Sequence, residues 1–103
     1  MFIYNVTSNV DQSIHKEWLK WMNETHIPDM LATGKFTNAK MIRVLVEEET
    51  EGYTYAVQFF TNSKETLNKY YQEDAPRLAQ HAFTLFADKV LSFKTELEII
   101  SEH

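Results

Sequence analysis

The chain has 103 residues, of which 44% are apolar and 14% aromatic, with no cysteine and only two glycines. This composition excludes a disordered or collagen-like chain. The lack of cysteine excludes a disulfide framework, a thiolate zinc site and a cysteine nucleophile. Ten Lys and Arg residues against fifteen Asp and Glu residues give a formal charge of −5, which argues against binding to nucleic acid.

We expect a single domain over residues 1–103. The first residues show neither a basic segment nor a long apolar run, so they do not predict a signal peptide. No stretch approaches the roughly 18 apolar residues that a membrane span needs. These features favour a cytoplasmic protein that does not bind a membrane.

The beginning of the chain predicts a strand and then a helix. Residues 2–7 are short, apolar and β-branched, which is typical of a strand. Asp11 and Ser13 are candidate N-caps for a helix that begins near Ile14. Its apolar stripe recurs at helical spacing, at Trp18, Trp21 and Met22.

Pro28 is expected to interrupt this helix or to start a new turn, because proline lacks the N–H that the position would donate. A further turn over residues 28–33 would end at Gly34, a typical residue after a helix C-terminus. Two strands are then predicted over residues 36–48 and 53–61. The polar segment between them, which ends in Gly52, indicates a hairpin.

Two helical segments and a strand complete the chain. Asn62 and Ser63 are expected to cap a helix that begins near Lys64, and Pro76 suits the first turn of a further helix. The apolar residues expected to be buried are Leu67, Tyr70 and Tyr71 in the first, and Leu78, Ala82, Leu85 and Phe86 in the second. Residues 90–100 alternate apolar and polar side chains, as a strand does.

The order of these elements is β-α-β-β-α-β. It predicts an α+β, ferredoxin-like βαββαβ fold. Right-handed crossovers would place both helices on one face of a four-stranded antiparallel sheet.

The strand register decides which residues lie under the helices. A hairpin that pairs Glu48 with Tyr53 would give a covered face of apolar residues, namely Ile42, Val44 and Val46 opposite Phe59, Val57 and Tyr55. The other face would mix apolar and polar groups, namely Met41, Arg43 and Leu45 opposite Phe60, Gln58 and Ala56, with Ile3, Asn5, Ser92 and Lys94. We expect a second copy of the chain to cover this mixed face in a homodimer. The alternative is a solvated sheet face.

Several segments are similar to a known family: residues 3–7 (IYNVT), 18–22 (WLKWM), 26–28 (HIP), 31–36 (LATGKF), 43–45 (RVL), 55–59 (YAVQF) and 93–97 (FKTEL). They resemble uncharacterised bacterial proteins that share a domain of unknown function with the dimeric α+β-barrel (ferredoxin-like) architecture. The resemblance covers nearly the whole chain. It implies the fold and a dimer but no established reaction. The broader superfamily includes cofactor-free monooxygenases, haem-degrading enzymes and muconolactone isomerase-like proteins.

His26 is a candidate general acid or base, because it lies near the expected helix end and an imidazole titrates near neutral pH. Alternatively, it caps the helix C-terminus, where a protonated imidazole opposes the helix dipole. Trp18 and Trp21 share a helix face and would line a pocket for a flat ligand. Their alternative role is that of plain core residues.

Arg43 and Gln58 form a second candidate site, because an arginine fork holds a carboxylate with two hydrogen bonds. Their alternative role is contact within a dimer interface, and the same holds for Asn5. The remaining histidines, His15, His81 and His103, are expected to be exposed. Their spacing is not that of metal ligands, so we expect neither a metal nor a cofactor.

Three functional hypotheses remain open. The first is a cytoplasmic homodimer that binds a small organic molecule, flat or acidic, with Trp18, Trp21, His26, Arg43 and Gln58 in the pocket. The second is a cofactor-independent monooxygenase- or isomerase-like enzyme, with His26 as general base and Arg43 or Asn5 stabilising an oxyanion. The third is an interaction module without a ligand.

Overall fold

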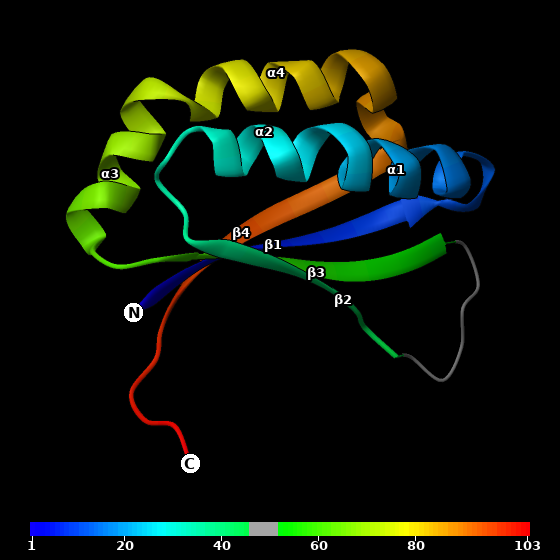
Figure 1. Cartoon of the computed structure of the whole chain (residues 1–103). Coiled ribbons are helices and arrows are strands. Elements are labelled where there is room, and N and C mark those ends of the chain that lie inside the picture. The colour runs from blue at the N-terminus through cyan, green and yellow to red at the C-terminus, as the bar shows by residue number, and fades with distance from the viewer. Residues whose placement is uncertain (46–51) are drawn as a thin grey trace.

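The computed structural model describes residues 1–45 and 52–103 (Figure 1). Four strands form one antiparallel sheet in the order β2-β3-β1-β4. Their bounds are β1 Phe2–Asp11, β2 Asn38–Arg43, β3 Gly52–Thr61 and β4 Val90–Glu98. The predicted order of elements and the α+β fold are confirmed. The tip of the predicted hairpin, residues 49–51, lies outside the described residues.

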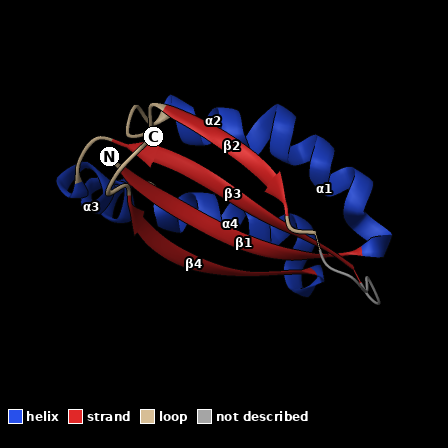
Figure 2. Ribbon diagram, turned by 90° about the horizontal axis from the view of Figure 1, so that it is seen from below, coloured by secondary structure: helices blue, strands red, loops and turns tan. Residues whose placement is uncertain are grey.

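The helices of the described residues lie on one face of this sheet (Figures 1 and 2). A 3-10 turn (η1, Gln12–Ile14) leads into α1 (His15–Trp21), a π-helical segment (η2, Met22–His26) and α2 (Ile27–Ala32). The second crossover consists of α3 (Lys64–Glu73), α4 (Ala75–Phe86) and a 3-10 turn (η3, Ala87–Lys89). Figure 2 shows the opposite face of the sheet without a helix over it.

Most of the predicted helix signals are confirmed, although Ser13 is not a cap. The carboxylate of Asp11 accepts the Ser13 backbone N–H at 2.8 Å, and Ser63 Oγ accepts that of Thr66 at 3.1 Å. Pro76 lies in the first turn of α4, and Gly34 has a φ of +78° after α2. Of the two roles considered for Pro28, the structure shows the start of a new helical segment and no interruption.

A π turn explains why the helix continues through Pro28. The Ile27 backbone N–H donates to the carbonyl of Met22, five residues back, which widens the helix immediately before the proline. Pro28 itself lies in the first turn of α2, where its missing N–H is tolerated. His26 therefore lies inside a continuous helical run, and the prediction that it caps a helix C-terminus is wrong.

The assumed hairpin register is also wrong. Ile42 lies opposite Ala56 rather than Phe59, a difference of three residues along β3. Because side chains alternate between the faces of a sheet, an odd shift moves every residue of β2 to the other face. Met41 and Arg43 thus share the helix-covered face with Val57 and Tyr55, whereas Ile42 faces away.

The face assignment of β4 changes in the same way. Ser92 and Lys94 lie opposite Ser8 and Val6, on the helix-covered face, and not on the open face as predicted. The apolar residues of β4 occupy the open face instead: Leu91, Phe93 and Leu97. Ile3 and Asn5 are on the open face, as predicted.

The core lies between the helices and the covered face of the sheet. Its most deeply buried side chains are Phe59, Met30, Leu67, Leu78, Val10 and Val57. Most of the expected helix residues contribute to it, but Leu85 is 50% exposed and does not.

Candidate functional site

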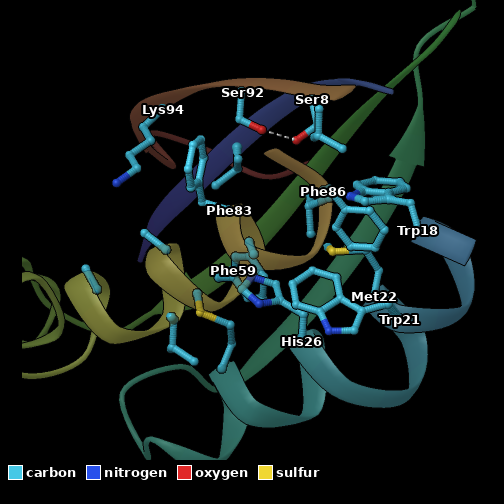
Figure 3. A pocket seen from close by; sticks show the side chains of 18 of the residues that line it. Ser8, Trp18, Trp21, Met22, His26, Phe59, Phe83, Phe86, Ser92 and Lys94 are labelled. Carbon is cyan, nitrogen blue, oxygen red and sulfur yellow. Dashed lines mark hydrogen bonds between the residues drawn. The ribbon is translucent and has the colours of Figure 1, made fainter. Parts of the chain in front are cut away.

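A cavity of about 310 Å³ opens between the helices and the covered face of the sheet (Figure 3). Strands β1, β3 and β4 form its floor, and α1, the π segment, α2 and α4 form its walls. Its volume is at the lower end of the range of small-molecule sites. The walls are mainly apolar and aromatic, so the cavity suits an organic molecule better than an ion.

Small side chains on α4 explain why the space remains open. Ala75, Ala79 and Ala82 lie three or four residues apart, and all three line the cavity. This spacing places them on one face of the helix. Larger aliphatic side chains at these positions would fill the gap between α4 and the sheet.

His26 enters the cavity from the π segment (Figure 3). Its ring stacks on the indole of Trp21, with centroids 4.8 Å apart and planes inclined by 23°. The pKa of His26 is lowered from 6.5 to about 4, mainly by burial; the charge of Asp29 opposes the shift, and the nearby His81 adds to it. The imidazole is therefore neutral at physiological pH.

Trp21 is fixed by aromatic contacts on several sides. The edge of its ring system meets Phe86 at 5.4 Å and His81 at 5.6 Å between centroids. Within the described residues, Trp21 Nε1 and His26 Nδ1 are buried and have no hydrogen-bond partner. Such atoms are rare in native proteins, and a bound molecule or water is one way in which they find a partner.

The strand side of the cavity carries the other polar groups. Ser8 Oγ and Ser92 Oγ, on the adjacent strands β1 and β4, are hydrogen-bonded to each other at 2.8 Å. Lys94 follows on the same face of β4, with Nζ 6.0 Å from the ring centroid of Tyr4. Figure 3 shows Ser8 and Ser92 across the cavity from Trp21 and His26, and Lys94 beside Phe83 with its ammonium directed away from the two serines.

Two tyrosines, Tyr4 and Tyr70, also line the cavity. Tyr70 Oη donates to Met30 Sδ at 3.3 Å, and the rings of Tyr70 and Tyr4 lie 5.3 Å apart. Burial raises the pKa of Tyr70 to about 12 and raises that of Tyr4 even more. Both phenols are therefore neutral, and neither supplies charge to a ligand.

The structure brings some of the predicted site residues together and separates others. Trp18, Trp21 and His26 all line the cavity. Asn5 and Gln58 lie opposite each other on the open face of the sheet, so they do not line the cavity. The predicted pairing of Arg43 with Gln58 is wrong, because Arg43 lies opposite Tyr55.

Arg43 is engaged away from the cavity. Its guanidinium lies 5.2 Å from the ring centroid of Tyr53. That ring in turn stacks on His15 at 3.8 Å between centroids, and His15 Nε2 is hydrogen-bonded to Tyr55 Oη at 2.7 Å. The expectation that His15 is exposed is therefore wrong: it is half-buried in this aromatic group.

Sequence reasoning missed Ser8, Ser92 and Lys94 as site residues. Alternation along β1 and β4 is visible in the sequence, but it does not say which set faces the helices. Among the described residues, no group of three or more His, Asp or Glu side chains is arranged to hold a metal ion.

The open face of the sheet is strongly apolar for a surface. Phe93 is 64% exposed, Leu91 65%, Ile42 44% and Leu97 38%. Between them lie Asn5, which donates to Thr7 Oγ1 at 3.2 Å, and the backbone-paired Gln58. Exposed apolar side chains of this size are a frequent feature of surfaces that contact another molecule.

None of the helices in the described part of the chain is both long enough and apolar enough to cross a membrane. The fold is similar to that of two dimeric ferredoxin-like proteins from uncultured marine organisms. The first has 12% identity and a TM-score of 0.73 over 99% of this chain and 97% of the other. The second has 14% identity and a TM-score of 0.69 over 100% and 98%.

A third similar structure is that of an ethyl tert-butyl ether d (ethd) family protein from Bacillus halodurans. It has 16% identity and a TM-score of 0.68, over 97% of this chain and 100% of the other. No curated protein matches the sequence. A family model does match residues 1–100, and the chain therefore belongs to the family described as a domain of unknown function (DUF4286).

Proposed function

We propose that this protein is a homodimer that binds a small, flat organic molecule in the cavity between its helices and its sheet, without converting it. The observation that carries the proposal is the cavity itself. It holds about 310 Å³ among apolar and aromatic side chains, with a few polar groups at fixed positions. This combination is the usual composition of a small-molecule site.

The aromatic wall favours a flat ligand. Trp18 is buried and Trp21 is held by Phe86, so both indoles present fixed surfaces. A planar molecule gains offset or edge-to-face contacts with such rings beyond the burial of its area. The neutral imidazole of His26 adds a hydrogen-bonding group without the desolvation cost of a charge.

The open face supports the homodimer. Phe93 and Leu91 are each about two-thirds exposed in the single chain, at 64% and 65%. Packing this face against the same face of a second copy would bury both in one isologous interface. The two marine proteins of the same fold are described as dimeric, which agrees with this arrangement.

The position of His26 also supports a second candidate, a cofactor-independent enzyme in which His26 accepts a proton. A strongly shifted titratable group in a cavity is a frequent feature of active sites. However, a pKa of about 4 makes a weak general base at neutral pH. The expected oxyanion partners, Arg43 and Asn5, do not line the cavity. Binding is therefore the better-supported function.

Thermal unfolding with 2-naphthoate and 2-naphthamide as planar probes tests the proposed binding. A probe that binds only the folded protein at one hundred times its Kd adds about 2.7 kcal/mol to the free energy of unfolding. We expect a concentration-dependent rise in Tm, together with a change in tryptophan fluorescence, since both indoles line the cavity.

The matched variants for this test are Ala82→Leu, which fills the cavity, and Ala32→Leu, which changes an exposed alanine of α2. Only Ala82→Leu should abolish the rise in Tm and the change in tryptophan fluorescence. The proposal fails if neither probe changes the Tm or the fluorescence of the unsubstituted protein, or if the response survives Ala82→Leu.

A further inference from the structure

We infer that the ligand of this cavity is an aromatic monocarboxylate whose carboxylate is bound by Lys94 at the cavity mouth. The inference rests on the proposed function, because it assigns the chemical class of the molecule that the cavity takes. It gives Lys94 the role of anion anchor, for which the sequence had suggested Arg43.

Lys94 is the one Lys, Arg, Asp or Glu side chain among the described residues that line the cavity. Its charge is not a consequence of a basic surface, since the chain has a formal charge of −5. A lysine beside an apolar cavity in an acidic protein places a positive potential at a defined point. That potential favours an anionic ligand over a neutral or cationic one.

The nearest acidic residue on the same strand face is engaged elsewhere. Glu96 forms an ion pair with Lys64 and accepts a hydrogen bond from Tyr71 Oη at 2.8 Å. Within the described part of the chain, Lys94 forms no salt bridge. Its ammonium lies 6.0 Å from the centroid of the Tyr4 ring. It is therefore available to a carboxylate that enters the cavity.

The surroundings of Lys94 strengthen such a contact. Val6 lies opposite it on β1, Tyr4 lies beside it, and the exposed ring of Phe83 lines the same cavity. Lys94 is itself exposed, but the apolar groups on its cavity side exclude part of the surrounding water, so an ammonium and a carboxylate attract each other somewhat more strongly here than on a fully solvated surface. A single ammonium matches a monoanion better than a phosphate, which needs several donors.

The remaining polar groups fit the body of the same ligand. Ser92 precedes Lys94 by two residues on one strand face, about 7 Å along β4. Its hydroxyl forms a pair with Ser8, and such a pair can also donate to a ring substituent. A ligand with its carboxylate at Lys94 would thus direct its planar part past the serines towards Trp21 and His26 (Figure 3).

Calorimetric titration with 2-naphthoate and 2-naphthamide separates charge from shape, because the two probes have nearly the same size. We expect the unsubstituted protein to bind 2-naphthoate at least tenfold more tightly than the amide. Lys94→Gln should remove that difference, Lys94→Arg should largely keep it, and Lys89→Gln, at an exposed lysine that does not line the cavity, should leave it unchanged. Raising the salt concentration should weaken the binding of 2-naphthoate alone.

The outcomes distinguish this inference from the proposed function. Equal affinities for the two probes, unchanged by Lys94→Gln, would overturn the carboxylate assignment while the binding function stands. A loss of both probes' binding in Lys94→Gln, with a native circular dichroism spectrum, would also overturn it, because Lys94 would then shape the cavity rather than bind an anion. Failure of both probes to bind the unsubstituted protein would overturn the proposed function itself.

Discussion

The rings of His26 and Trp21 stack at 4.8 Å between centroids, and the π turn over Met22–His26 places the imidazole in the cavity. Trp21 and His26 are five residues apart, more than one turn of a regular α-helix. The wider turn brings the two rings to the same side. An interruption of the regular helix thus builds the wall on which the proposed ligand would lie, as π segments at functional sites often do.

The buried imidazole makes stability depend on pH. As the pH falls below 6.5, His26 in the unfolded chain gains a proton, but in the folded protein it does so only near pH 4. The unfolded state then binds more protons, so the free energy of unfolding decreases as the pH is lowered through this window. The decrease attributable to His26 is at most on the order of 3 kcal/mol.

Urea unfolding of the unsubstituted protein and of His26→Gln between pH 7.5 and pH 4 measures this contribution. The difference between the free energies of unfolding of the two proteins should change with pH between pH 6.5 and about pH 4. His103→Gln, at an exposed terminal residue, serves as the control and should follow the unsubstituted protein. Parallel curves for the unsubstituted protein and His26→Gln would contradict a neutral, buried His26.

Filling the cavity should stabilise the protein and remove binding together. Ala82→Leu adds apolar groups to a space bounded by α4 and the sheet, and about 1 kcal/mol of additional stability is expected from the surface removed from water. Differential scanning calorimetry would show a rise in Tm of several degrees. A lower Tm would mean that the wall beside Ala82 is already closely packed.

The homodimer should depend on the open face of the sheet. Phe93→Lys places a charge at a position where we expect a buried ring, and an isologous interface contains the substitution twice. The dissociation constant should rise roughly 100-fold or more, since burial of each ring contributes about 1.5–3 kcal/mol. Light scattering after size exclusion, over a range of protein concentrations, measures this dissociation constant. Leu85→Lys, at an exposed position on the helix side, is the control and should leave it unchanged. A dimer unaffected by Phe93→Lys would place the interface elsewhere.

The two glycines should differ in their tolerance of alanine. A Cβ on Gly52 would lie 2.5 Å from the backbone oxygen of Val10, so a strand would have to move. Gly34 has open space around it but a φ of +78°. We expect Gly34→Ala to cost about 1 kcal/mol and Gly52→Ala about 2 kcal/mol or more. Chemical denaturation measures both, and the reverse order would contradict the close approach at Gly52.

Elements whose signals are local could be predicted from the sequence. Asp11 and Ser63 cap helices because their side chains reach backbone N–H groups two or three residues ahead, and Pro76 starts a helix because of its own φ angle. The β-α-β-β-α-β order followed from such signals together with apolar periodicity. Trp18, Trp21 and His26 could be assigned to the site for the same reason, since they belong to one helical run.

The tertiary structure alone decided which residues share a face and where space remains. The observed pairing of β2 with β3 differs from the assumed one by an odd number of residues, so Arg43 and Gln58 are on opposite faces of the sheet. The pairing of β4 with β1 places Ser92 and Lys94 on the face that the helices cover. Alternation with a period of two is equally compatible with either face, so only contacts between distant segments select one. The cavity is likewise a relation between α4 and the sheet, and no local pattern contains it.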